Sequence, residues 1–196
     1  MAMVRQFDEE AVLGKVLELF WVKGWQATSM ADLAEATDVQ RGSLYHAYGS
    51  KEHLFQLAFD RYAETVLTES RQALDAPTAR LALERFFDVS IISMTADLPP
   101  RGCFTTKTAV ESDAIGETMQ NRVRDLLEQL EAVIAEALSH DALRASLAVP
   151  PDSAAQAIIA FTRGLAVVER IYHEPARLRE LAALQIRLLV GPEAGN

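Results

Sequence analysis

Residues 28–51 have the sequence TSMADLAEATDVQRGSLYHAYGSK, and this stretch decides how the rest of the chain is interpreted. Ser29 with Asp32 three residues later is the pattern of a capping box, which starts a helix. Residues 37–39 interrupt that helix, and residues 40–45 follow as a helix of fewer than two turns. Two short helices joined by a tight turn favour a DNA-binding motif, because a major groove admits one helix with polar side chains.

The second short helix carries the side chains that suit DNA. Gly42 permits close approach of its backbone to a ligand, and donors and acceptors suited to base edges or phosphates stand around it: Gln40, Arg41, Ser43 and Tyr45. Thr28 and Lys51 each stand at the start of a helix, where side-chain and backbone donors can hold a phosphate together. The alternative is that this segment is only a turn with a few core aromatic residues.

The charge of the chain argues against a simple nucleic-acid assignment. The net charge is −9 over 196 residues, whereas DNA affinity comes largely from cations that neutralise phosphates. Residues 1–51 carry five Lys or Arg against seven Asp or Glu, so most of the acidity lies outside the suspected motif. Local geometry therefore has to bring Arg41, Lys51 and the helix N-termini to the phosphates.

The sequence gives little support for a disulfide-bonded protein, a metal-binding protein, an enzyme or a membrane protein. A single cysteine, Cys103, excludes an internal disulfide and a cysteine-based zinc cluster, and the four histidines lack metal-ligand spacing. No nucleophile–base order, phosphate loop or Glu-x-x-His pair points to an enzyme, so we expect no catalytic residue, metal or cofactor. Because the chain shows no leader and no apolar run of about 18 residues, we expect a soluble, cytoplasmic protein without membrane contact.

The periodicity predicts an all-α fold of about nine helices, because apolar residues recur at helical spacing and nowhere alternate as in strands. A helix-turn-helix domain is predicted for residues 1–51, and a ligand-binding and dimerisation domain for residues 52–196. The expected helices cover residues 8–24, 28–37, 40–45, 51–74, 78–95, 103–111, 114–139, 153–172 and 176–190. Prolines and glycines at residues 97–102 and 149–152 mark the main breaks.

The last two helices are predicted to pair with those of a second copy. The helix at 153–172 is apolar nearly all round, which is typical of a helix buried on more than one side. A leucine stripe on the helix at 176–190 provides a companion surface. The same pattern also fits a core within one chain, and that alternative stays open here.

Residues 28–55 resemble the N-terminal signature of the TetR-like (TetR/AcrR) transcriptional regulators. In that signature an A-D-L-A-E-A helix precedes V-x-x-G-S-L-Y-x-x-F-x-S-K-E-x-L, and here residues 39–54 stand as VQRGSLYHAYGSKEHL. Ala47 and Tyr48 depart from the pattern, although Tyr48 keeps the ring that packs under the helix. The resemblance implies that Thr28, His46 and Lys51 hold phosphates, and that bases or backbone face Gln40, Arg41, Ser43 and Tyr45. Leu44 is either core or an apolar contact to a thymine methyl group.

The resemblance further implies a dimeric regulator, by family default a repressor, which binds a palindromic operator and releases it on binding a small-molecule effector. An apolar cavity with a few polar groups is the usual form of an effector site. Its candidate lining is Phe86, Phe87, Ser90, Met94, Cys103, Phe104, Lys107, Met119 and Phe161. Any of the apolar residues can instead be plain core, and Lys107 can orient a ligand with Glu111 or simply pair with it.

Cys103 opens a further alternative. Residues 102–111, GCFTTKTAVE, resemble the G-C-L-x-x-x-x-A-x-E segment of a TetR-like subgroup in which some members sense oxidants or electrophiles through this cysteine. A thiol at a helix N-terminus has a lowered pKa, whereas a buried thiol is an inert small hydrophobe. A third alternative is a helical adaptor protein that does not bind DNA.

Overall fold

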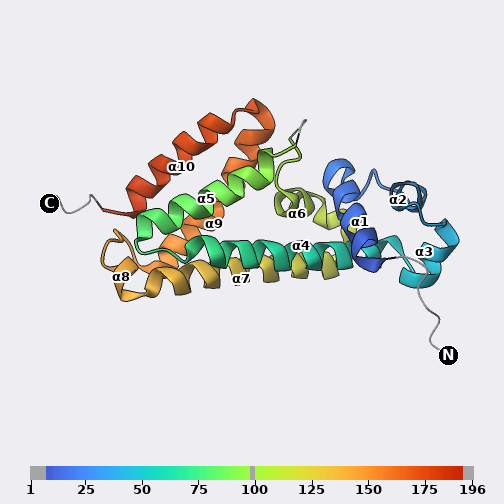
Figure 1. Ribbon diagram of the computed structural model, residues 1–196, viewed down its shortest axis with the longest axis horizontal. Coiled ribbons are helices and arrows are strands. Elements are labelled where there is room, and N and C mark those ends of the chain that lie inside the picture. Colours follow the sequence, from blue (N-terminus) through green and yellow to red (C-terminus); the bar gives the residue numbers. More distant parts are fainter. Residues whose placement is uncertain (1–7, 98–99, 192–196) are drawn as a thin grey trace. The chain divides into compact units, whose positions relative to one another are not determined.

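The computed structural model describes residues 8–97 and 100–191, and helices account for almost all of its regular structure (Figure 1). They are α1 (Glu9–Lys23), α2 (Met30–Thr37), α3 (Arg41–Tyr48), α4 (Lys51–Leu74), α5 (Ala79–Thr95), α6 (Phe104–Ile115), α7 (Glu117–Ser139), α8 (Asp141–Arg144), α9 (Pro151–Tyr172) and α10 (Pro175–Leu189). The described residues contain no strand, only an isolated antiparallel bridge between Leu147 and Val190. The predicted all-α fold is confirmed. Within the same residues, no helix has the length and apolar character needed to cross a membrane.

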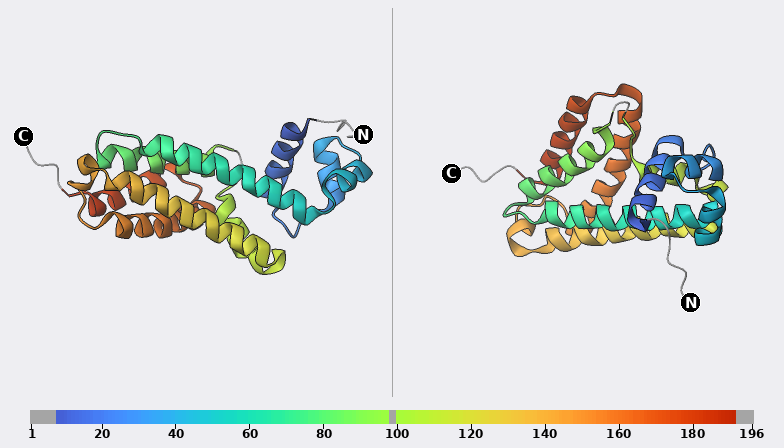
Figure 2. Two further views of the ribbon diagram at one scale, coloured as in Figure 1. Left: turned by 90° about the horizontal axis from the view of Figure 1, so that it is seen from below. Right: turned by 45° about the vertical axis from the view of Figure 1, so that its right-hand side comes forward.

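The chain forms two compact units. The first consists of the chain up to Glu64 together with Lys107–Val123, and the second consists of Thr65–Thr106 and the chain from Arg124 onward. Both α4 and α7 are continuous helices that contribute residues to each unit (Figure 2). The boundary predicted after residue 51 differs from this division, because the first half of α4 and most of α6 group with the N-terminal helices.

Caps and turns fix the helices of the first unit. The Asp8 carboxylate caps α1 by accepting from the backbone N–H groups of Glu10 and Ala11. Gly24 ends the helix with a positive φ of 84°, which glycine adopts without steric cost. Ser29 and Asp32 form the predicted capping box at the start of α2. These local signals are why α1 begins directly after Asp8 and α2 directly after Ser29.

Aromatic packing holds the first unit together. The Phe20 ring meets the Phe55 ring edge-on at 4.6 Å and stacks on the Trp25 ring at 6.1 Å. Leu33 from α2 and Leu44 from α3 are fully buried. Burial of such side chains contributes about 1.5–3 kcal/mol each. Of the two roles open for Leu44, the structure supports a place in the core.

Four predicted helix boundaries were wrong. α3 continues past residue 45 to Tyr48, because the Tyr48 ring is buried in the unit. Gly49, with a φ of 76°, then ends the helix. α6 extends to Ile115, and α7 begins at Glu117 rather than at 114, because Gly116 with φ 101° separates them. α9 begins at Pro151 rather than at Ser153, since proline fits the first helical position.

The second unit packs α5 against α9 and α10. Its core includes the fully buried side chains of Leu83, Ile91 and Ile158, and Leu165 and Leu178 are each 1% exposed. The predicted break near residues 97–102 lies between the end of α5 and the start of α6. Leu98 and Pro99, which belong to that prediction, lie outside the described residues.

Candidate nucleic-acid interface

α3 places the predicted DNA-contacting side chains on one exposed surface. Leu44 and Tyr48, one turn apart, are 0% and 4% exposed and anchor the helix on the unit. Five of the seven predicted DNA contacts lie on α3 or at its start and are exposed: Gln40, Arg41, Ser43, Tyr45 and His46. A helix that is anchored on one side and polar on the other can enter a groove without losing its core contacts.

Arg41 and Tyr45 lie one turn apart on this surface. The Arg41 guanidinium lies 5.5 Å from the centroid of the Tyr45 ring, within the range of a cation–π contact. The Tyr45 ring remains 42% exposed. The contact restricts both long side chains while leaving the hydroxyl and the guanidinium donors available.

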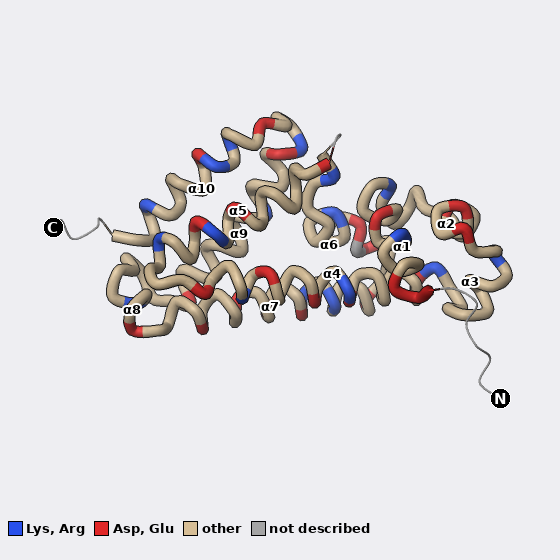
Figure 3. Tube along the Cα trace, viewed as in Figure 1, with Lys and Arg blue, Asp and Glu red and all other residues tan. Residues whose placement is uncertain are grey.

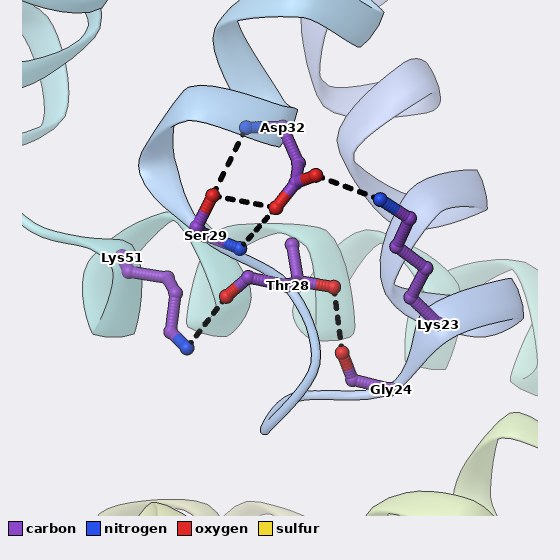
Figure 4. Close-up of polar contacts among 6 residues, drawn as sticks. All are labelled: Lys23, Gly24, Thr28, Ser29, Asp32 and Lys51. Carbon is purple, nitrogen blue, oxygen red and sulfur yellow. Dashed lines mark hydrogen bonds and ion pairs between the residues drawn. The ribbon is translucent and has the colours of Figure 1, made fainter.

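A network of polar contacts fixes the N-terminus of α2 to the C-terminus of α1 (Figure 4). The Ser29 hydroxyl accepts from the Asp32 backbone N–H, and the Asp32 carboxylate accepts from the Ser29 backbone N–H at 2.8 Å. The Lys23 ammonium donates to the other Asp32 oxygen at 2.7 Å. The hydrogen bonds from Lys23 and Ser29 hold the pKa of Asp32 far below its usual value.

Thr28 and Lys51 hold the turn between α1 and α2 (Figure 4). Thr28 is 2% exposed, and its hydroxyl donates to the Gly24 carbonyl at 2.6 Å. The Lys51 ammonium donates to the carbonyls of Trp25 and Thr28 at 2.9 and 2.8 Å and lies 3.9 Å from the Trp25 ring centroid. Burial lowers the pKa of Lys51. Phosphate contacts by these two side chains therefore stay predictions, because both are engaged within the unit.

Free positive charge is sparse around the motif. Arg41 is the only Lys or Arg of α3, whereas α2 carries Asp32 and Glu35 (Figure 3). Lys15 is exposed on α1. The described residues of α1 to α3 therefore present hydrogen-bonding groups and few free cations to a partner.

α6 clamps the C-terminus of α1, a role that the sequence did not predict. The Lys107 ammonium donates to the carbonyls of Trp21 and Val22, each at 2.7 Å. Glu111, one turn further, accepts from the Trp25 backbone N–H at 2.8 Å. A Cβ added to Gly24 would lie 2.8 Å from a Glu111 carboxylate oxygen, so a larger residue would displace Glu111, and the positive φ of Gly24 also favours glycine. We name this arrangement of Lys107 and Glu111 the α6 clamp.

Two stretches of the chain match known families. Residues 15–58 match bacterial regulatory proteins of the tetR family. Residues 77–184, more than half of the chain, match the tetracyclin repressor-like C-terminal domain. The chain belongs to the tetR family. It is therefore a transcriptional regulator, which agrees with the exposed surface of α3.

Two relatives share this tetR-family sequence over part of their length. The HTH-type transcriptional repressor ComR of Escherichia coli (strain K12) is 34% identical over 122 residues, which are 59% of this chain and 58% of ComR. The match therefore spans less than two thirds of ComR. The HTH-type transcriptional regulator YezE of Bacillus subtilis (strain 168) is 27% identical over 146 residues, which are 74% of this chain and 73% of YezE.

Solved structures of tetR-family regulators have the same fold. Reduced NemR of E. coli gives a TM-score of 0.84 at 20% identity, over 94% of this chain and 98% of NemR. A cysteine mutant of CifR, complexed with 26 bp double-strand operator DNA, gives a TM-score of 0.82 at 26% identity. That alignment covers 96% of this chain and 100% of CifR.

Seven of the nine residues predicted to bind the effector fall in the second unit of this tetR-family chain. The Phe87 ring meets the Phe86 ring and the Phe161 ring edge-on, at 5.7 Å in both cases. The Ser90 hydroxyl is committed to the Phe86 carbonyl at 2.9 Å. Met94 and Phe104 are buried, and Cys103 is half-buried and immediately precedes α6.

The other two predicted effector residues lie in the first unit. Met119 is 1% exposed and belongs to its core. The Lys107 ammonium donates to the carbonyls at the end of α1, and its role in binding an effector stays a prediction. That contact joins residues 86 positions apart, so no local sequence pattern could have revealed it.

Proposed function

We propose that this tetR-family regulator is a dimeric repressor that binds a palindromic operator and releases it on binding a small-molecule effector. The observation that carries the proposal is the exposed surface of α3, with Arg41, Ser43 and Tyr45 outward and Leu44 buried beneath. Repression is the activity named for ComR, and binding to double-strand operator DNA is the state in which CifR was solved.

The surfaces of α9 and α10 support dimerisation. α9 buries Leu165 within its own unit, yet Val167 and Ile171 on its other side are 53% and 66% exposed. On α10, Leu184 and Leu188 are 46% and 64% exposed. An intrachain core accounts for the buried sides of these helices but not for the exposed apolar sides. A second copy would cover them, and two half-sites would multiply the specificity of one short helix.

The aromatic residues of the second unit support an effector site. The edge-on contacts of Phe86, Phe87 and Phe161 join α5 to α9. An apolar effector that separates these rings would move α5 relative to α9. Allosteric release requires that the effector bind the DNA-free state more tightly than the operator-bound state.

The test is fluorescence anisotropy with the DNA upstream of the gene for this protein. Arg41→Ala and Tyr45→Ala should each weaken binding about 5- to 150-fold, the loss of about 1–3 kcal/mol expected for a good base contact. Arg144→Ala removes the same charge from α8 and should leave the affinity unchanged. If neither α3 variant weakens binding, or if no DNA binds even at low salt, the repressor proposal fails. A helical adaptor protein then becomes the better explanation of the chain.

Salt provides an independent readout. Because, of the described Lys and Arg residues up to residue 51, only Arg41 and Lys15 lie exposed and outside the polar networks of the motif, we expect about two to four neutralised phosphates per dimer and a log–log salt slope of roughly −2 to −4. A slope of about −8 or steeper would mean that Lys51 and other engaged cations rearrange to hold phosphates.

Cys103 supports a second candidate, a thiol-based sensor. Its side chain is half-buried and free, and it stands directly before α6, the helix that carries the α6 clamp. NemR was solved in a reduced form and CifR as cysteine mutants. A Cys103→Ser variant should stay on operator DNA under hypochlorite or a reactive aldehyde that releases the native protein. Equal release of both proteins would remove this candidate and leave the effector-binding repressor intact.

A further inference from the structure

The second unit contains a groove that the proposed function does not use. The C-terminal ends of α4 and α7 lie side by side next to α8 (Figures 1 and 2). The groove is lined by residues from these three elements and has a volume of about 460 Å³. Its floor is apolar and includes Leu74, Val133 and Leu143, all of them buried. Small-molecule sites typically measure about 300–1,000 Å³, so the groove has room for a ligand of moderate size. We call it the α4–α7 groove.

Four charged or titratable side chains form the rim. Asp75 and Glu136 contribute carboxylates, Arg71 a guanidinium and His140 an imidazole, and all four are exposed. In the part of the chain that the structure describes, none of these side chains forms a hydrogen bond or an ion pair. Groups of opposite charge thus surround the apolar floor without neutralising one another, which leaves them available to a ligand.

The ends of two helices add negative potential. α4 ends at Leu74 and α7 at Ser139, so the C-terminal carbonyls of both helices lie near the groove. Aligned peptide dipoles give a helix C-terminus a partial negative charge, which favours a cation. Among the lining residues, the carboxylates of Asp75 and Glu136 outnumber the one permanent cation, Arg71. Arg85, outside the lining, donates to the Asp75 carbonyl at 3.1 Å and offsets part of the negative potential at the end of α4. The lining residues themselves carry a net negative charge.

We propose that the α4–α7 groove binds a small organic cation, an ammonium or amidinium group on an apolar body. The cation would lie between Asp75 and Glu136, and the apolar body would cover the floor of Leu74, Val133 and Leu143. No residue of the groove belongs to the predicted effector set, so this is a separate site. It lies at the far end of the same helix, α4, whose first residue is Lys51.

Benzamidine tests the proposal, with benzamide as the neutral analogue and benzoate as the anionic one. All three have a similar apolar ring and differ in charge. Methyl-labelled protein should show saturable shifts of the Leu74, Val133 and Leu143 signals with benzamidine, whereas the methyl signals of Leu178 on α10 should not move. Equal shifts with benzamide or benzoate would show an apolar depression without charge selection, and an absence of shifts at the floor would show no site. Either result overturns the proposal.

Charge variants locate the cation. Asp75→Asn and Glu136→Gln should each weaken benzamidine about two- to fivefold, the size expected for an exposed ion pair. Glu128→Gln is the matched control, because Glu128 is exposed on the same helix and outside the groove lining. Arg71→Gln should not weaken benzamidine, since it removes a repulsive charge. All four changes are at exposed positions and leave the core intact. Unchanged affinity in both carboxylate variants would refute the assignment.

Discussion

The α6 clamp makes a quantitative prediction about the stability of the DNA-binding unit. Lys107→Met keeps most of the aliphatic length of the side chain but removes the ammonium that bonds to the carbonyls of Trp21 and Val22. The bond to Trp21 is partly buried, and the bond to Val22 is exposed. Water therefore replaces the second bond more completely than the first.

The expected loss follows from these contacts. A net hydrogen bond contributes about 0.5–1.5 kcal/mol, and a cation at a helix C-terminus contributes about 0.3–1 kcal/mol. Since the two contributions at Lys107 overlap, we expect Lys107→Met to lower the free energy of unfolding by about 1–2 kcal/mol. For a chain of this length, such a change lowers the Tm by roughly 2–8 °C.

Thermal unfolding by circular dichroism, at one fixed protein concentration, measures the effect. Lys15→Met is the matched control. Lys15 is exposed on α1, and its substitution removes the same charge without breaking a contact. The reasoning is refuted if the two variants have Tm values within about 1 °C of each other, because the expected loss exceeds that difference.

Glu111 provides the second arm of the same experiment. Glu111→Ala leaves the Trp25 N–H without its acceptor, which costs about 1–3 kcal/mol where that donor is shielded from water. Glu111→Gln keeps an acceptor oxygen and should recover most of the loss. Similar Tm values for the Ala and Gln variants would mean that the hydrogen bond to Trp25 contributes nothing.

Three further predictions concern single positions. Gly164→Leu should convert the proposed dimer to monomers in analytical ultracentrifugation, whereas Gly14→Leu should not. Within one chain, an added Cβ meets nothing within 4 Å at either glycine. A dimeric Gly164→Leu variant would place the interface elsewhere. The Asp32 carboxylate has a lowered pKa in the folded state, so its contribution to stability is present above about pH 4 and is lost as the pH falls below that value. In urea unfolding, the free energy of unfolding of the native protein should exceed that of Asp32→Asn by a constant amount from pH 7 to about pH 5, and this difference should narrow at lower pH. A difference that does not depend on pH would contradict this account. Thr28→Val should lower the free energy of unfolding by about 1–2 kcal/mol through loss of the bond to Gly24, with Thr28→Ser close to native, and equal losses would assign the effect to packing instead.

Helix starts could be predicted from the sequence because capping is local. Ser29 with Asp32, and Thr78 before α5, bond to backbone N–H groups within three residues, so the pattern itself contains the interaction. Gly116 was harder to interpret. A glycine within a helical pattern is often tolerated, and only its φ of 101° shows that it separates α6 from α7.

Contacts between distant residues could not be predicted in this way. Lys107 stands on a helix with apolar neighbours, which suggested a ligand site, yet its partners are carbonyls 85 and 86 positions earlier. Backbone carbonyls carry no sequence signature, so nothing in residues 102–111 identifies them as partners. The α3 surface was predictable because one helix turn already contains both the buried Leu44 and the exposed Tyr45.

The positive charge available to DNA is smaller than the sequence count suggests. Of the four described Lys and Arg residues up to residue 51, the ammonium of Lys23 is paired with Asp32 and that of Lys51 is bound to two carbonyls. Both positive charges help to hold α2 in position, which leaves Arg41 and Lys15 for phosphates. Because few cations are free among the described residues of α1 to α3, the operator binding proposed for this acidic tetR-family chain would depend on hydrogen bonds from α3 and on backbone donors at helix N-termini. Because such contacts require close fit, the geometry of α2 and α3 matters more here than bulk charge, and the contacts that fix that geometry become determinants of affinity.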